Sequence, residues 1–143
     1  MKSLLSLPIL LAALLLFSCG KSNPPQPQEQ LPPGVAKTHS GLKSKILRPG
    51  KGGRTPNSLS TVKVHYKGWT KEGNVFDTSY QRGIPAEFPL AAVIPGWTEG
   101  VQLMTKGEKR RFWIPARLAY GNQPSGGRPA GDLTFDIELI DFR

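Results

Sequence analysis

The sequence has few of the residues on which metal centres and nucleophilic active sites depend. It holds one cysteine and two histidines in 143 residues, so no internal disulfide can form. His39 and His65 belong to no cluster with metal-ligand spacing. The motifs G-x-S-x-G, G-x-x-x-x-G-K-S/T and H-E-x-x-H are also missing. These absences disfavour hydrolytic, phosphoryl-transfer and metal chemistry, and we expect neither a metal nor another cofactor.

Long apolar runs are equally scarce, and the one that exists lies at the N-terminus. Lys2 precedes the apolar residues 4–17, and small residues follow at 18–20, which is the pattern of a signal peptide and too short to span a bilayer. Leu16-Phe17-Ser18-Cys19 resembles the bacterial lipobox, in which the cysteine thiol receives lipid. We expect a leader at 1–18 and an exported protein anchored through Cys19, on the outer membrane or the periplasmic membrane face if the organism has two membranes. Ordinary cleavage after Gly20 is the alternative.

Proline and glycine, by contrast, are abundant, with 14 and 16 residues. Residues 20–34 contain five prolines and almost nothing to bury, so they cannot form a core. We expect an extended tether over residues 19–36 and one loop-rich domain over 37–143. A proline-rich recognition ligand remains an alternative for the tether.

Charge is one-sided, with 19 Lys and Arg against 10 Asp and Glu and a formal net charge of +9. The basic residues are spread through linker, strands and loops and form no dense run. This distribution disfavours nucleic-acid binding and favours attraction to an anionic membrane or cell-wall surface.

Alternating apolar and polar residues predict several half-buried strands. In residues 60–69, Val62, Val64 and Tyr66 share one side, and His65 falls on the charged side, where we expect it to be solvated. Trp113 should point outward over Arg111 or its neighbours. The strands are predicted at 41–47, 60–69, 75–79, 86–90, 109–114 and 133–142, and an irregular loop at 122–132.

A short helix is predicted within residues 93–104, because Trp97, Val101 and Met104 stand at i, i+4 and i+7. Pro95 suits its start, and the Lys-Gly pair at 106–107 suits its end. So short a helix is unstable alone and needs a sheet around it. The sequence therefore predicts an α+β fold, with about five antiparallel strands around one short helix and Trp97 in an aromatic hollow.

Five stretches of the sequence carry a resemblance to a known family. They are V-H-Y-K-G at 64–68, G-N-V-F-D-T-S at 73–79, V-I-P-G-W-T-E-G-V at 93–101, I-P-A-R-L-A-Y-G at 114–121 and L-T-F-D-I-E-L at 133–139. In this order they resemble the FK506-binding (FKBP) family of peptidyl-prolyl cis-trans isomerases, in a bacterial lipoprotein form. The resemblance covers about residues 40–142, which is nearly the whole predicted domain.

The resemblance implies a half-open antiparallel sheet wrapped around the helix, with a proline-binding hollow between them. Trp97 would be the floor beneath the prolyl ring. The walls would be Tyr66, Phe76, Val93, Ile94 and Phe135. The Ile94 N–H and the Tyr120 hydroxyl would donate hydrogen bonds to substrate carbonyls. Asp77, held by Tyr66, would be the polar group beside the twisting amide.

The implied activity is isomerisation of X-Pro bonds in exported or unfolded proteins, with no covalent step and no cofactor, because an apolar pocket favours the twisted amide. Implied partners are proline-containing polypeptides and macrolide inhibitors of the FK506 type, and the chain should be a monomer. Two departures concern the pocket rim: Ala86 replaces a usual aromatic residue, and Gly126, Gly127 and Arg128 replace bulky apolar ones. A catalytically weak proline-binding or chaperone module tethered to the membrane is the alternative.

Overall fold

The structure is a computed structural model that describes residues 29–143, of which Leu31–Arg143 form one compact unit. The predicted leader, Cys19 and most of the tether lie outside the described residues. The compact unit begins before residue 37, because the two-residue strand β1 (Ala36–Lys37) pairs with β2 (Lys43–Arg48). Within residues 29–143, no helix is both long and apolar enough to cross a membrane.

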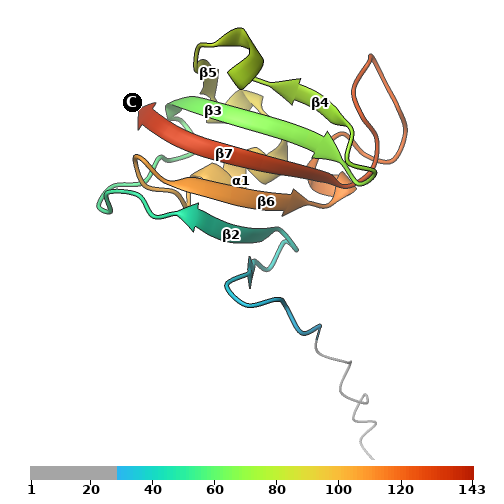
Figure 1. Cartoon of the computed structure of the whole chain (residues 1–143), viewed down its shortest axis with the longest axis horizontal. Coiled ribbons are helices and arrows are strands. Elements are labelled where there is room, and N and C mark those ends of the chain that lie inside the picture. The colour runs from blue at the N-terminus through green and yellow to red at the C-terminus, as the bar shows by residue number, and fades with distance from the viewer. Residues whose placement is uncertain (1–28) are drawn as a thin grey trace, which may run out of the picture. The chain divides into compact units, whose positions relative to one another are not determined.

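The unit is built on one antiparallel sheet (Figure 1). Beyond β1 and β2, its strands are β3 (Thr61–Thr70), β4 (Val75–Thr78), β5 (Ala86–Pro89), β6 (Lys109–Ile114) and β7 (Leu133–Phe142). Their spatial order is β1-β2-β6-β7-β3-β4, and β5 also pairs with β3. The sheet therefore has seven strands rather than about five, because the short strands β1, β4 and β5 attach to the edges of the longer ones.

Period-two alternation gives the sheet one apolar face and one charged face, as predicted. On β7 the buried residues are Leu133, Phe135, Ile137 and Leu139, and the polar residues between them point the other way. On β3 the buried residues are Val62, Val64, Tyr66 and Gly68. The apolar face thus forms the core and the wall of any site beside it.

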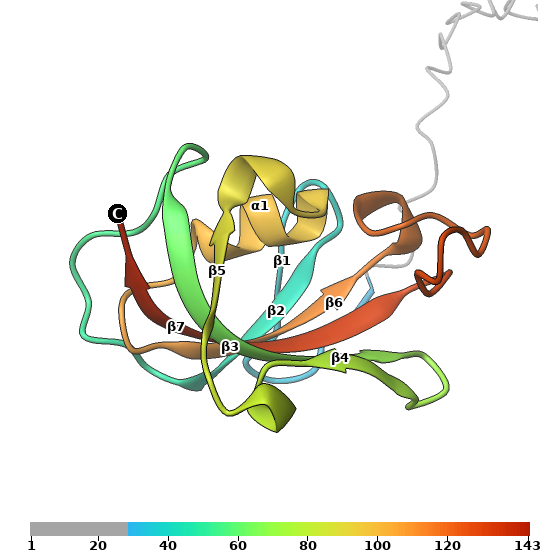
Figure 2. The ribbon, with the colours of Figure 1, turned by 90° about the horizontal axis from the view of Figure 1, so that it is seen from above.

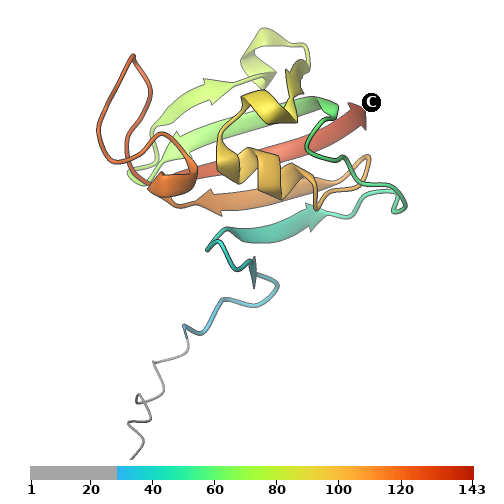
Figure 3. The same cartoon turned by 180° about the vertical axis from the view of Figure 1, so that it is seen from behind.

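Residues 29–143 contain one α-helix, α1 (Pro95–Val101), which lies against the apolar face, and this face curves around it (Figures 2 and 3). Two glycines set how closely it packs. A Cβ at Gly96 would lie 2.5 Å from Ile114 Cγ2, and one at Gly100 would lie 2.6 Å from Phe112 Cε1. Because neither glycine has a Cβ, the helix backbone can lie directly on β6.

The predicted end of the helix is wrong, since α1 stops at Val101. Leu103 and Met104 donate their N–H groups to the carbonyls of Gly100 and Val101, which tightens the chain into a turn. That turn returns Met104 to the core, where it is fully buried. Gly107, expected as the helix terminator, instead adopts φ +86° in the turn before β6.

The segment expected to be an irregular loop contains a tight hairpin. Ser125 and Arg128 pair, with the Arg128 N–H donating to the Ser125 carbonyl at 3.0 Å. Gly126 and Gly127, between them, both have positive φ, the combination that a two-residue type I′ turn requires. The rest of residues 122–132 is irregular, as predicted, and the two adjacent glycines account for the turn.

Candidate active site

A hollow of about 420 Å³ lies between α1 and the apolar face of the sheet. Gly68 on β3 makes room for its aromatic walls, because a Cβ there would lie 2.6 Å from Phe135 and 2.8 Å from Phe76. Those two rings pack edge to face, with centroids 5.5 Å apart. The hollow is lined by Tyr66, Phe76, Asp77, Phe88, Ala92, Val93, Ile94, Trp97, Tyr120, Arg128 and Phe135.

Trp97, on the helix, is held in place by three perpendicular rings. Its centroid lies 5.2 Å from that of Tyr66, 5.7 Å from that of Phe88 and 5.4 Å from that of Phe135. Only 4% of the Trp97 surface is exposed, yet the residue lines the hollow. Its Nε1 is buried and finds no hydrogen-bond partner within residues 29–143. The indole is therefore a fixed, largely apolar floor.

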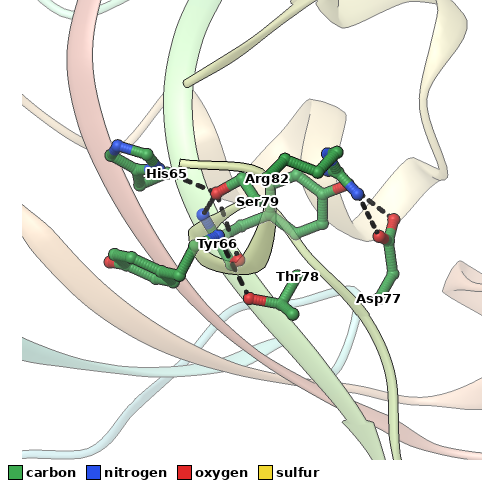
Figure 4. Close-up of polar contacts among 7 residues, drawn as sticks. His65, Tyr66, Asp77, Thr78, Ser79 and Arg82 are labelled. Atoms are coloured by element: carbon green, nitrogen blue, oxygen red, sulfur yellow. Dashed lines mark hydrogen bonds and ion pairs between the residues drawn. The ribbon is translucent and has the colours of Figure 1, made fainter. Parts of the chain in front are cut away.

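Three polar side chains form a closed triangle at one side of the hollow (Figure 4). The Tyr66 hydroxyl donates to Asp77 Oδ2 at 2.5 Å. Arg82 donates from Nη1 to Asp77 Oδ1 at 3.0 Å and from Nη2 to the Tyr66 hydroxyl oxygen at 2.9 Å. Each group restrains the other two, so the Asp77 carboxylate is held in place beside the hollow.

The triangle also sets the ionisation of its members. Burial opposes the charge of Asp77, but the hydrogen bonds from Tyr66 and Arg82 outweigh it and lower the pKa of this carboxyl. Burial and the neighbouring carboxylate raise the pKa of Tyr66. Asp77 is therefore ionised and Tyr66 protonated at neutral pH. The charge of Arg82 balances that of Asp77, so the triangle as a whole is neutral.

A second network, on the other side of β3, positions Tyr66 itself. Ser79 is fully buried, and its hydroxyl accepts the Tyr66 N–H at 2.8 Å and lies 2.9 Å from His65 Nδ1. The His65 ring stacks on Tyr80 with centroids 4.8 Å apart. His65 is therefore not a solvated surface residue, as its place among lysines had predicted. The strand pattern could not reveal a partner that comes from the end of β4.

Two hydrogen-bond donors at the hollow are left without partners in the described residues. Ile94 precedes α1, and its carbonyl accepts from Trp97 and Thr98, whereas no described residue accepts from its N–H. The Tyr120 hydroxyl likewise has no hydrogen-bond partner among residues 29–143. The Arg128 guanidinium lies 5.4 Å from the Tyr120 ring centroid, so the hairpin adds a cation to the rim.

All eight residues predicted for the pocket line this one hollow: Tyr66, Phe76, Asp77, Val93, Ile94, Trp97, Tyr120 and Phe135. Phe88, Ala92 and Arg82 were missed. Phe88 could have been found, because it alternates inward with Ala86 on β5. Ala86 itself packs against the core and does not line the hollow. The place of Arg82 depends on the 3-10 helix η1 (Tyr80–Arg82) and has no signal in the sequence.

The site is suited to binding without covalent chemistry. Its residues offer a rigid apolar floor and walls, one neutralised carboxylate and two open donors, but no serine, cysteine or lysine nucleophile. Across residues 29–143, no three His, Cys, Asp or Glu side chains come together as metal ligands. Such a pocket can bind an apolar ring and donate a hydrogen bond to a backbone carbonyl, and it can exclude water from the bond between them.

Residues 52–140 match the family described as FKBP-type peptidyl-prolyl cis-trans isomerase. The FKBP-type peptidyl-prolyl cis-trans isomerase FkpA of Aeromonas hydrophila is 50% identical over 108 residues, which are 75% of this chain and 40% of FkpA. The FKBP-type 22 kDa peptidyl-prolyl cis-trans isomerase of Escherichia coli (strain K12) is 44% identical over 111 residues, 76% of this chain and 53% of that protein.

A solved structure of the same family resembles this fold. The crystal structure of FkpA from Escherichia coli matches with a TM-score of 0.73 and 43% identity, covering 78% of this chain and 53% of that one. This chain thus spans about half the length of the relatives it matches, or less. The part that matches the family, residues 52–140, contains the helix α1 and every residue of the hollow. By its sequence and its fold, the chain belongs to the FKBP-type peptidyl-prolyl cis-trans isomerase family.

Proposed function

We propose that the chain is a peptidyl-prolyl cis-trans isomerase that turns X-Pro bonds in exported or unfolded polypeptides. The observation that carries the proposal is that the eight site residues implied by the family resemblance all line one aromatic hollow. The relatives named above bear the name of this activity. The substrate would be a proline-containing segment in an extended conformation.

The reaction needs what this hollow offers. Rotation about a peptide bond has a barrier of about 18–20 kcal/mol, because resonance in the planar amide must be broken. A twisted amide has lost its charge separation, so an apolar, water-poor site favours it over the planar form. Lowering the barrier by about 4–7 kcal/mol accelerates rotation by roughly 10³–10⁵. No nucleophile is required.

Each residue then has a role. Trp97 lies beneath the prolyl ring, and the aromatic walls exclude water. The Ile94 N–H and the Tyr120 hydroxyl, both open, donate to substrate carbonyls and fix the chain on either side of the bond. Asp77, immobilised by Tyr66 and Arg82, lies beside the turning amide. The triangle keeps this charge in place without a large reorganisation when substrate binds.

The test is a protease-coupled assay on a proline tetrapeptide, run with and without an FK506-type macrolide. Acceleration that the macrolide abolishes is the expected result. A folded protein that leaves the rate at the uncatalysed level would favour the alternative, a proline-binding module without turnover. That alternative uses the same hollow and is supported by the charged rim, where Arg128 lies beside the Tyr120 ring.

We further propose that the domain acts outside the cytoplasm as a monomer anchored by lipid on Cys19. The support is the leader pattern and the lipobox resemblance in the sequence. Mass analysis of the mature N-terminus tests this: a diacylated Cys19 is expected, and an unmodified chain that starts at Lys21 would contradict it. Sedimentation of the purified domain tests the monomer.

A further inference from the structure

The outer, charged face of the sheet carries a second hollow, of about 1120 Å³, which the isomerase site does not use. In Figure 1 this face is toward the viewer, and α1 lies behind the sheet. Pro32 and Val35, ahead of β1, form one wall of the hollow. The rest of its lining comes from β1 and the turn after it, β2, the end of β3 and the turn after it, β6 and the segment after it, and the start of β7.

The strand register places two tryptophans in one row across this hollow. Trp69 on β3 and Trp113 on β6 both pair with Thr134 on β7, from opposite sides. Neighbouring strands are about 4.8 Å apart, so the two tryptophan Cα atoms are about 10 Å apart. Both side chains are half-buried and line the hollow. They form an aromatic row with Thr134 between them.

A row of charges runs beside the aromatic row, two residues or about 7 Å further along the strands. It consists of Lys45, Arg111, Asp136 and Lys67, which are paired from strand to strand in that order. Arg111 donates to both Asp136 oxygens, at 2.7 and 2.9 Å. Lys45 and Lys67 have no ion-pair partner in the described part of the chain. Three cations therefore face one carboxylate.

The lining of the hollow repeats this imbalance. Besides Lys45 and Arg111 of the charged row, it includes Lys71 and Arg117, against one carboxylate, Asp132. A concave, partly apolar surface with such an excess of positive charge attracts a negatively charged segment and gains from burying an aromatic or aliphatic side chain with it.

We propose that this outer hollow binds an extended acidic segment of a polypeptide. An apolar side chain of the segment would pack against Trp113, and its carboxylates would reach Lys45 in the hollow and Lys67 beside it. The binding does not depend on proline or on the isomerase activity. Where the isomerase pocket acts on the same polypeptide, a segment held on the outer face raises the local concentration of its prolines at the inner hollow.

Two other anionic partners suit the surface less well. Successive bases of a single-stranded nucleic acid need open aromatic faces on which to stack. The ring of Trp69 is covered by Arg111 at 5.2 Å and by Lys67 at 5.9 Å, so only Trp113 remains. An anionic membrane needs protruding aromatic side chains that reach the interface. Here the two indoles are half-buried within a concavity.

The probe is a short, proline-free, fluorescein-labelled peptide that alternates glutamate with phenylalanine and serine, titrated with the full chain at low salt. We expect saturable binding with a dissociation constant of about 100 μM or tighter. Lys45→Gln with Lys67→Gln should weaken it about fivefold or more. Trp113→Ala should weaken it about tenfold. Lys51→Gln with Lys63→Gln is the matched control, since it removes the same charge from exposed positions off the hollow, and should change binding less than about twofold.

Three results would overturn the proposal. One is the absence of saturable binding while the tetrapeptide assay shows an active isomerase. Another is equal weakening by the two double variants, which would indicate net charge rather than this surface. The third is tighter binding of single-stranded DNA or of phosphatidylglycerol vesicles that depends on Trp113, Lys45 and Lys67. An inactive isomerase that still binds the peptide would refute the proposed activity and leave the outer site standing.

Discussion

The two faces of the sheet use the same residue types in different surroundings. On the inner face, Trp97 is enclosed by three rings and lies beside a carboxylate whose charge Arg82 balances. On the outer face, Trp69 and Trp113 lie among cations, of which Lys45 and Lys67 have no ion-pair partner in residues 29–143. The inner surface is therefore suited to an uncharged ring, and the outer surface to negative charge.

Strand β3 shows how one stretch of chain serves both surfaces. Tyr66 and Gly68 point inward, where one holds Asp77 and the other makes room for Phe76 and Phe135. Lys67 and Trp69 point outward into the charged row and the aromatic row. A shift of register by one residue would exchange the two sets and abolish both sites together. Substitutions on the inner and outer faces should therefore have separable effects on stability, activity and binding.

Truncating a tryptophan should lower the free energy of unfolding far more on the inner face than on the outer face. Trp97→Ala removes a buried indole from a packed cluster and should lower the free energy of unfolding by about 3–5 kcal/mol. Trp113→Ala, half-buried on the outer face, should lower it by about 1 kcal/mol or less. Urea denaturation of the two variants measures the difference. Equal losses would mean that the outer indole is also part of the core.

Removing a carboxylate should lower isomerase activity when the carboxylate lies on the inner face, but not when it lies on the outer face. Asp77→Asn keeps the size of the side chain but takes its charge from the triangle, and kcat/KM on a proline tetrapeptide should fall about 10- to 100-fold. Asp136→Asn breaks the bidentate pair with Arg111 on the outer face and should leave kcat/KM within about twofold. If Asp77→Asn isomerises as fast as the unmodified protein, the role given to this carboxylate is wrong.

The ionisation of Asp77 makes a prediction about pH. Its pKa is lowered in the folded protein, so its contribution to stability is present above the unfolded-state value of about 4 and is lost as the pH falls through the lower folded value. We therefore expect kcat/KM to be constant from about pH 5 to pH 8 and to fall only below about pH 4. A stopped-flow pH series on a substrate without ionisable side chains measures this. An inflection near neutral pH would assign a different titrating group to the reaction.

Tyr120 allows a smaller and cleaner test of the inner face. Tyr120→Phe removes one hydroxyl that has no partner in the described residues, so the free energy of unfolding should change by no more than about 0.5 kcal/mol. If the hydroxyl donates to a substrate carbonyl, kcat/KM should fall about three- to tenfold, the equivalent of one hydrogen bond. Tyr80→Phe is the matched control, since its hydroxyl donates to Glu138 on the outer face. Equal kinetics for both variants would remove Tyr120 from the site.

Much of this arrangement could be predicted, because it follows from patterns that short stretches of sequence contain. Alternation placed Tyr66 and Phe135 on the inner face, and the family resemblance brought Asp77 and Tyr120 to the same hollow. What was missed depends on contacts between distant segments. Arg82 reaches the triangle only because η1 folds back toward β3, and the bond between His65 and Ser79 crosses from β3 to the end of β4. Neither contact has a local signal.

The end of the helix shows a different limit. The apolar spacing of Trp97, Val101 and Met104 is compatible with a longer helix, and it predicts one that includes Met104. Close packing of Gly96 and Gly100 on β6 decides otherwise, because the chain must turn after Val101 to bury Met104 beneath the sheet. Apolar periodicity indicates which residues are buried. It does not show whether a buried residue lies in the last turn of the helix or after the helix has ended.

The rim of the inner hollow resembles the outer hollow in one respect, because both carry an excess of positive charge. The hairpin places Arg128 over Tyr120, and this guanidinium has no ion-pair partner in the part of the chain described. Because Arg82 already balances Asp77, Arg128 leaves the mouth of the pocket positive. We therefore expect a modest preference for peptides with glutamate rather than lysine before proline, about threefold in kcat/KM at low salt, since an exposed charge pair contributes little.

Arg128→Gln should bring that ratio close to one, and so should high salt, because the interaction is screened over about 10 Å at 0.1 M salt. The backbone N–H that closes the hairpin is kept, so the loop itself should persist. Arg117→Gln removes the same charge from the outer hollow, where Arg117 donates to the Ser40 carbonyl. The ratio should survive in that variant. If both variants abolish it, the preference reflects the net charge of the whole domain, and the two faces would be less independent than their side chains indicate.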